Sequence, residues 1–205
     1  MTTDTTITPC PPQCTPWGPA QTVKDLGDGV YAISTVSHGG YWLSPKAMAK
    51  VRKLFPTAML FAGDPWFEED CDWCFVAITF WKKFPIKASE NAQVTLRNSH
   101  PECYERLHGV TLQPGESREK DDQAFYENNK NNWVTVSAVG SWHEQCPEGY
   151  VLVSACIGGR KEHRFLRPTV DFLVPQEEYD ARTGPFVIDT SRHSRLDHFA
   201  AKAQS

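Results

Sequence analysis

The chain has 205 residues, of which 40% are hydrophobic and 22% are charged, and it includes seven Trp, eleven Phe and six Tyr. This apolar content can offset the entropy lost on ordering the chain, so extensive disorder is excluded, and the length favours one domain around a single core. The formal net charge of −4 gives no long-range attraction to phosphate backbones, and we expect no strong direct nucleic-acid binding.

The first residues of the chain and its cysteine content indicate the expected cellular compartment. The first residues have no basic segment followed by an apolar one, and no run approaches the roughly 18 apolar residues of a membrane span. Seven cysteines is an odd number, which is typical of free thiols in a reducing compartment. We therefore expect a cytoplasmic protein with no membrane association and no structural disulfides.

The N-terminal part of the sequence predicts an arm followed by a hairpin. Residues 1–16 carry four prolines and no large apolar side chain after Ile7, so they are expected to form a flexible, extended arm before one domain over residues 17–205. Residues 21–26 and 30–36 are β-rich runs on either side of a Gly-Asp-Gly turn. This pattern predicts a β-hairpin.

Two Xaa-Pro pairs indicate helix starts. Ser44-Pro45 supplies an N-cap and a proline at the first helical position, which predicts a helix over residues 45–54. Asp64-Pro65 repeats the signal before apolar residues at helical spacing, which predicts a core helix that Pro85 ends. A competing strand interpretation exists for residues 75–80, which are aromatic and β-branched.

The remaining elements complete the fold class. A further helix is predicted over residues 89–107, ending at Gly109, and residues 115–132 are expected to form a surface loop or a weak helix. Short apolar runs separated by Gly, Pro and charged residues then indicate an antiparallel sheet. These runs are residues 133–139, 150–157, 164–166, 171–174 and 186–189. The sequence thus predicts an α+β fold with an N-terminal β-hairpin, central helices and a C-terminal antiparallel sheet.

Four carboxylates gather at the predicted start of the core helix: Glu68, Glu69, Asp70 and Asp72. Carboxylates are favourable in a first helical turn, where amides are exposed. At about 100° per residue, Glu69 and Asp70 fall on the apolar face, whereas Glu68 and Asp72 fall to the side. Two inward carboxylates need partners, so the cluster is either a structural network that pins the preceding loop or a functional site.

A second candidate feature is the Ser-His-Gly-Gly turn over residues 37–40. Two glycines permit positive φ and close approach of a ligand or a neighbouring segment, so the turn either presents His38 or is an ordinary hydrogen-bonded turn. If it meets the acidic helix start, His38 lies beside Glu69 or Asp70. The candidate binding residues are therefore His38, Gly39, Gly40, Trp42, Glu68, Glu69 and Asp70.

The cysteines offer a weaker signal. Cys71 and Cys74 have the two-residue gap of zinc and redox motifs, and Cys10 and Cys14 could supply a second pair. One pair would come from the arm and neither has the usual glycines, so buried cysteine is the competing interpretation. We predict no metal site and no cofactor, and the sequence contains no complete catalytic motif.

Eight short stretches, most of them within residues 16–193, form a recognisable set of motifs. They are residues 15–18 (TPWG), 37–40 (SHGG), 43–44 (LS), 66–73 (WFEEDCDW), 95–98 (TLRN), 172–175 (FLVP), 178–180 (EYD) and 186–189 (FVID). Together they resemble an uncharacterised domain family of proteobacterial plasmids, integrative elements and phages. Members of that family more often carry alanine at the position of Cys74, which argues against a Cys-x-x-Cys metal site. The resemblance brings no established activity, but it implies an accessory or anti-defence role.

Two hypotheses about function follow. The first is a non-enzymatic binding protein that docks on a host complex, such as restriction or CRISPR machinery, and inhibits it, because exposed acidic clusters can compete for basic nucleic-acid grooves. The alternative is a small metal-dependent hydrolase that uses His38, Glu69 and Asp70 around a divalent ion.

Overall fold

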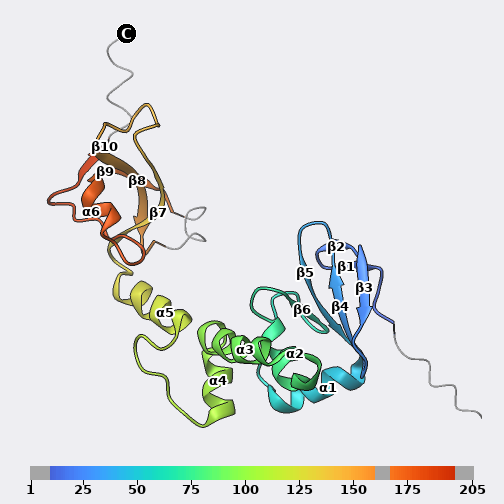
Figure 1. Cartoon of the computed structure of the whole chain (residues 1–205). Coiled ribbons are helices and arrows are strands. Elements are labelled where there is room, and N and C mark those ends of the chain that lie inside the picture. Colours follow the sequence, from blue (N-terminus) through green and yellow to red (C-terminus); the bar gives the residue numbers. More distant parts are fainter. Residues whose placement is uncertain (1–9, 160–166, 197–205) are drawn as a thin grey trace, which may run out of the picture. The chain divides into compact units, whose positions relative to one another are not determined.

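The structure is a computed structural model that describes residues 10–159 and 167–196 (Figure 1). The chain divides into two compact units, with the boundary between Asp121 and Asp122. Both combine helices with antiparallel strands, which confirms the predicted α+β class. The interpretation of residues 17–205 as one domain stays a prediction. Among the described helices, none combines the length and the apolar character needed to cross a bilayer.

Unit 1 begins with strands. Its main sheet has the antiparallel order β3-β4-β5-β6, and a small two-stranded ladder precedes it. The strands are β1 (Cys14–Thr15), β2 (Gly18–Pro19), β3 (Thr22–Asp25), β4 (Val30–Ser34), β5 (Gly39–Leu43) and β6 (Trp66–Glu68). The predicted hairpin is confirmed as β3 and β4. Most of the predicted arm, residues 1–9, lies outside the described residues.

Helices form the rest of unit 1 and lead into unit 2. They are α1 (Pro45–Leu54), α2 (Trp73–Thr79), the 3₁₀ turn η1 (Trp81–Lys83), α3 (Ile86–Ser99), α4 (Pro101–His108) and α5 (Arg118–Asn128). The prediction for α1 is confirmed: Ser44 Oγ accepts the amide hydrogen of Ala47 at 3.3 Å, and Pro45 is the first helical residue. The single helix predicted over residues 89–107 is instead two, because Pro101 forces His100 out of helical geometry, to φ −136°.

The prediction of one long core helix from Pro65 to Phe84 is wrong. Its first residues form β6, which adds to the sheet edge with Trp66 opposite Trp42 and Phe67 opposite Tyr41. The neighbouring side chains Trp66 and Phe67 consequently enter two different clusters. Sheet pairing thus overrides the local helical signal, and α2 begins only at Trp73. The competing strand over residues 75–80 is also absent, since α2 occupies most of that range.

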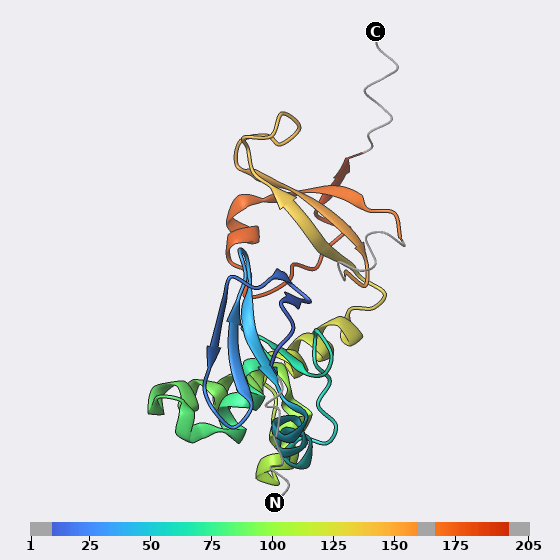
Figure 2. The same ribbon diagram turned by 90° about the vertical axis from the view of Figure 1, so that its right-hand side faces the viewer.

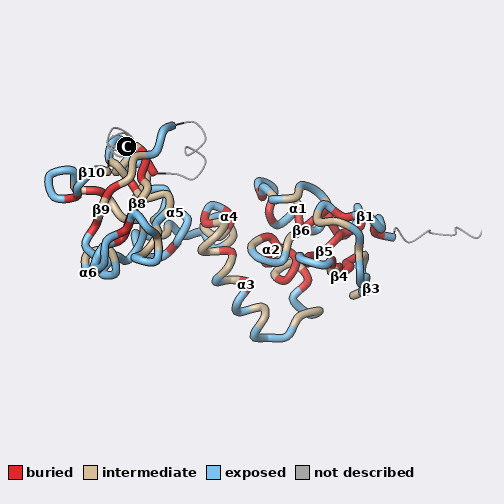
Figure 3. The backbone as a smooth tube through the Cα atoms, turned by 90° about the horizontal axis from the view of Figure 1, so that it is seen from above, coloured by how far each residue is buried: buried red, intermediate tan, exposed pale blue. Residues whose placement is uncertain are grey.

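The sheet of unit 1 has a core on each face. On one face, helices α1 to α4 pack with Leu43 and Phe67 around Phe75, which is fully buried. On the other, Tyr31, Trp42 and Trp66 occupy adjacent register positions and form an aromatic row, and Trp17 meets Trp66 edge to face at 5.8 Å. Figure 3 shows buried segments along β4, β5 and α2.

Unit 2 is a four-stranded antiparallel sheet in the order β10-β9-β8-β7. Its elements are β7 (Trp133–Val139), β8 (Tyr150–Ile157), β9 (Val170–Pro175), α6 (Gln176–Asp180) and β10 (Ser194–Leu196). Helix α6 packs beside β8 and β9, as Figures 1 and 2 show. The predicted C-terminal sheet is therefore confirmed.

Two of the runs predicted for this sheet have other outcomes. Residues 186–189 are not a strand of the sheet, since they contribute only an isolated bridge between Val187 and Val134, and β10 takes the fourth place. Residues 164–166 lie outside the described residues.

Replacing Phe75 by alanine should destabilise unit 1 more than replacing Trp73, although Trp73 stands at the centre of the apolar pattern. Phe75 is fully buried and its ring lies 4.9 Å from Phe55, whereas Trp73 is only half-buried. We expect a loss of about 3–5 kcal/mol for Phe75→Ala in urea unfolding. Trp81→Ala, at a side chain that is 60% exposed, is the control with little effect. A larger loss for Trp73→Ala would contradict this packing.

Candidate functional site

The acidic segment is organised by the Glu68 carboxylate. Its Oε2 accepts the amide hydrogen of Asp70 at 2.5 Å, and its Oε1 accepts those of Cys71 at 2.5 Å and Asp72 at 2.9 Å. Three consecutive amides that would otherwise lack partners therefore converge on one side chain. This contact ends β6, turns the chain and sets the start of α2 at Trp73.

Asp72 connects that turn to two other segments of unit 1. Its side chain is 2% exposed, and Oδ2 accepts the amide hydrogen of Phe61 at 2.7 Å. Oδ1 lies 3.3 Å from Nε2 of His100, without a hydrogen bond between them. The His100 ring packs on Phe75 with 4.5 Å between ring centroids. One buried carboxylate thus ties the loop before β6 and the junction of α3 and α4 to the start of α2.

The predicted orientation of the carboxylates is wrong. Glu69 and Asp70 were expected to point inward but are exposed, whereas Asp72 is the buried carboxylate and Glu68 is half-buried. The helical phase was counted from Pro65, but this helix starts at Trp73, so the assumed 100° steps do not apply to the residues before it.

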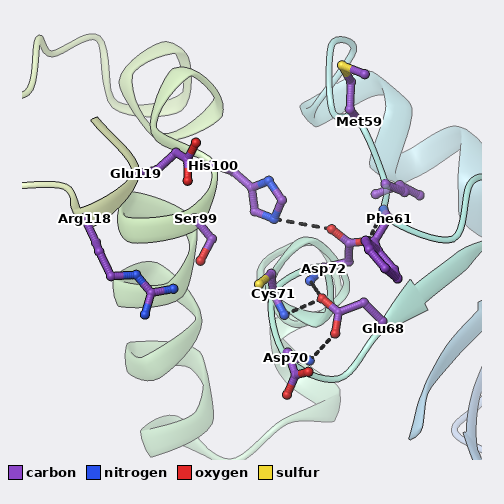
Figure 4. Close-up of a pocket in the computed structure, with 11 residues that line it drawn as sticks. Met59, Phe61, Glu68, Asp70, Cys71, Asp72, Ser99, His100, Arg118 and Glu119 are labelled. Carbon is purple, nitrogen blue, oxygen red and sulfur yellow. Dashed lines mark hydrogen bonds and ion pairs between the residues drawn. The ribbon is translucent and has the colours of Figure 1, made fainter. Parts of the chain in front are cut away.

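These contacts border a pocket of about 550 Å³ in unit 1. Its described lining residues are Met59, Leu60, Phe61, Glu68, Asp70, Cys71, Asp72, Ser99, His100, Arg118 and Glu119. In Figure 4, Met59 and Phe61 come from the loop on one side, Arg118 extends from the start of α5 on the other, and the turn at residues 70–72 lies between them. Met59 and Phe61 are each 87% exposed.

The Ser-His-Gly-Gly turn lies beside the acidic turn, but His38 does not engage it. Gly40 pairs with Glu68 between β5 and β6, and the Glu69 amide donates to the Gly39 carbonyl at 3.1 Å. The His38 side chain is exposed, and among the residues that the structure describes no hydrogen bond or ion pair joins it to Glu69 or Asp70. The two segments meet through these backbone contacts and through the Glu69 side chain, which lies over Gly39.

The two glycines are required by close approach within the chain itself. A Cβ at Gly39 would lie 2.5 Å from Oε2 of Glu69, and a Cβ at Gly40 would lie 2.6 Å from the Trp17 ring. Trp42 is 7% exposed in the aromatic row. Gly40 and Trp42 are therefore explained by packing within the chain. Of the candidate binding residues that the sequence indicated, Glu68 and Asp70 are the ones that line the described pocket.

Sequence reasoning missed several pocket residues. Phe61 is an apolar residue in a loop, and His100 lies between helices α3 and α4. Arg118 begins α5, a helix that the sequence indicated only weakly. The one available signal was the proline after His100, which marks a helix break and hence a corner of the fold. Nothing in the sequence brings these three residues together.

Metal-ligand side chains do not converge in the parts of the chain that are described. No group of three or more His, Cys, Asp or Glu residues there could hold a metal ion, so neither the cysteine pairs nor His38 with Glu69 and Asp70 form such a group. All seven cysteines are free. Burial raises the pKa of the Cys74 thiol, with the nearby Asp72 carboxylate acting in the same direction.

Cys71, Asp72, Ser99 and His100 are residue types that also build nucleophilic sites, but their arrangement here differs. Burial raises the pKa of the Cys71 thiol, as do the neighbouring carboxylates, while a hydrogen bond with Ser99 acts in the opposite direction. A catalytic cysteine needs a lowered pKa and a base within reach. Among the described residues, no hydrogen bond joins His100 to Cys71 or Ser99.

Unit 2 has a separate pocket of about 400 Å³, lined by Trp133, Phe172 and residues 190–195. In it, Nδ1 of the buried His193 accepts the Asp189 amide hydrogen at 3.0 Å, and Nε2 lies 3.3 Å from the Glu178 carboxylate. Arg192 donates to both Glu178 and Asp189, and hydrogen bonds from Ser191 and Arg192 lower the pKa of Asp189 to about 2. These charges satisfy one another, which indicates a network that holds the loop before β10.

Glu68→Gln should lower the stability of unit 1 without altering its surface elsewhere. The amide side chain has one acceptor oxygen in place of two and no charge, so it cannot accept all three backbone amides. A loss of about 1–3 kcal/mol in urea unfolding is expected. Asp70→Asn is the matched control, because that carboxylate is exposed and should change stability by less than about 0.5 kcal/mol. Equal effects of the two changes would refute the role given to Glu68.

Cys71 should react slowly with iodoacetamide. Its pKa is raised by burial and by the surrounding carboxylates, so little thiolate exists near neutral pH. At pH 8, peptide mapping by mass spectrometry should find Cys71 modified more slowly than the exposed Cys14. Faster modification of Cys71 would show an activated thiol and would favour an enzyme.

Comparison with known proteins gives one match. The model for the family described as domain of unknown function DUF7007 matches residues 10–130, which is more than half of the chain and includes every residue that lines the unit 1 pocket. No curated protein and no solved structure matches the chain. Met59, Phe61 and the pocket that they line fall within the matched residues. The chain therefore belongs to the DUF7007 family, a domain of unknown function.

Proposed function

We propose that this protein is a non-enzymatic binding protein and that the unit 1 pocket is its docking site for a protein partner. The observation that carries the proposal is the 87% exposure of both Met59 and Phe61 beside a pocket of about 550 Å³. Burying a side chain of this size contributes roughly 1.5–3 kcal/mol. Large apolar side chains that enter or rim a pocket are typical binding hot spots.

The loop that carries these side chains is held at several points. The Asp72 carboxylate accepts the Phe61 amide hydrogen, and the Arg52 guanidinium binds both the Ala58 carbonyl and the Asp64 carboxylate. A loop fixed before binding loses less conformational entropy when a partner arrives. Met59 and Phe61 are therefore presented on a prearranged surface.

The alternative hypothesis, a small metal-dependent hydrolase that uses His38, Glu69 and Asp70, has less support. It requires the three side chains to converge on one ion, whereas His38 makes no described bond to either carboxylate and all three side chains are exposed. The raised pKa of Cys71 also disfavours covalent catalysis in the pocket.

The class of partner is a separate proposal. We infer from the resemblance to mobile-element proteins that the chain is an accessory protein in the cytoplasm and that its partner is a host defence complex, such as restriction or CRISPR machinery. Exposed carboxylates at Glu69 and Asp70 fit this proposal, because the nucleic-acid grooves of such complexes are basic.

Affinity capture from a bacterial lysate tests both proposals. Proteins bound by the wild-type chain should be lost, by at least about tenfold, with the double variant Met59→Ala, Phe61→Ala, because about 3–6 kcal/mol of apolar burial is removed. Ile86→Ala is the matched control, since that side chain is 81% exposed but lies outside the pocket.

The outcomes separate the two proposals. Capture that the double variant leaves unchanged would refute docking at the pocket. Mass spectrometry that identifies no subunit of a defence complex among the proteins dependent on Phe61 would refute the proposed class of partner while leaving docking intact.

A further inference from the structure

We propose that the pocket of unit 1 receives a basic side chain, a lysine or arginine flanked by apolar residues, from the docking segment of the partner. This inference rests on the proposed function and adds the chemistry of the partner. It depends on the charges around the pocket, on which carboxylates are already satisfied and on the exposed ring of Phe61.

The charges lining the pocket are mainly negative. Four carboxylates line it, against one guanidinium and one imidazole. The exposed Glu69 adds a further negative charge beside the same turn. A concave surface with an excess of one sign concentrates ligands of the opposite sign, so a cationic segment is favoured on approach.

Three of these carboxylates, Glu68, Asp70 and Asp72, belong to the acidic turn and have different roles. Glu68 accepts three backbone amides. Asp72 accepts the Phe61 amide and its side chain is only 2% exposed, so both carboxylates contribute charge but neither is open to a further partner. Asp70 is different, because its carboxylate is exposed and pairs with no cation among the described residues. It is the acceptor that an incoming ammonium or guanidinium group can reach.

Phe61 and Met59 suit the same kind of side chain. The aliphatic stem of lysine or arginine packs on apolar surface while its charged end remains hydrated or paired. An exposed aromatic ring also attracts a cation over its face. Phe61 and Asp70 line the same pocket and come from different segments, so one basic side chain can contact both.

Arg118 allows a basic partner segment to be distinguished from an acidic one. Its guanidinium lines the pocket and has no ion pair within the described part of the chain. A basic partner is repelled by Arg118, whereas an acidic partner would bind to it. Removing this one side chain should therefore strengthen binding of a basic segment and weaken binding of an acidic one.

The experiment is an NMR titration of the full ¹⁵N-labelled chain with three capped pentapeptides that share one apolar frame: LKFRL, LQFQL and LEFEL. The basic peptide should shift the amide signals of Phe61, Asp70 and Arg118 and should bind at least about threefold more tightly than the neutral one. Its affinity should fall as salt is raised, since the attraction is screened.

Variants then test the named residues. Asp70→Asn should weaken the basic peptide by about two- to fivefold, and Arg118→Ala should strengthen it by about twofold. Glu90→Gln is the matched control, because it removes an exposed carboxylate of α3 outside the pocket and should change nothing. Unchanged spectra of each free variant outside the substituted region verify that the fold is kept.

Four results would overturn the inference. Tighter binding of the acidic peptide, or weaker binding of the basic peptide by Arg118→Ala, would reverse the assigned charge preference while leaving the docking pocket in place. Equal binding of the basic and neutral peptides would show that the pocket recognises only the apolar side chains that the peptides share. If none of the three peptides shifts the pocket signals, the inference and pocket docking both fail.

Discussion

The geometry of unit 1 depends on one carboxylate that accepts three successive backbone amides. Without Glu68, the amides of residues 70–72 would lack partners at the point where a strand becomes a helix, and buried or half-buried amides without partners are costly. The same contact fixes where Asp72 projects, so the loop at Phe61 and the corner at His100 are positioned by it. Local hydrogen bonding in a five-residue segment thus determines the shape of the pocket.

Under the proposed function, the same acidic cluster has a structural role and also takes part in recognition. Two of its carboxylates are consumed in building the turn, and two remain exposed. The charges of the first pair still contribute to the field around the pocket, because hydrogen bonds from neutral amides do not cancel a charge. A segment that holds the fold together therefore also contributes negative charge to the surface around the pocket.

The sequence predicted the elements whose signals are local. The helix after Ser44-Pro45, the hairpin about Gly27–Gly29 and the β-rich character of the C-terminal part follow from caps, turns and alternation. The sequence-based prediction failed where pairing between strands distant in the sequence decided the structure. Trp66–Glu68 belongs to a stretch with helical spacing, but it pairs with β5, and this error reversed the prediction of which carboxylates point inward. The pocket was beyond prediction, because Phe61, His100 and Arg118 come from three separate segments with no shared motif.

The contact between Gly40 and Trp17 has a consequence for how this sequence can change. A Cβ at residue 40 would lie 2.6 Å from the indole and 2.3 Å from the Phe67 carbonyl oxygen, so Trp17, the first residue after the predicted arm, packs on the sheet only because residue 40 has no side chain. The indole could give way to a smaller ring, but the carbonyl belongs to β6. Relatives that lose the glycine should therefore show linked changes at residue 17 and along the whole edge strand, rather than an isolated substitution.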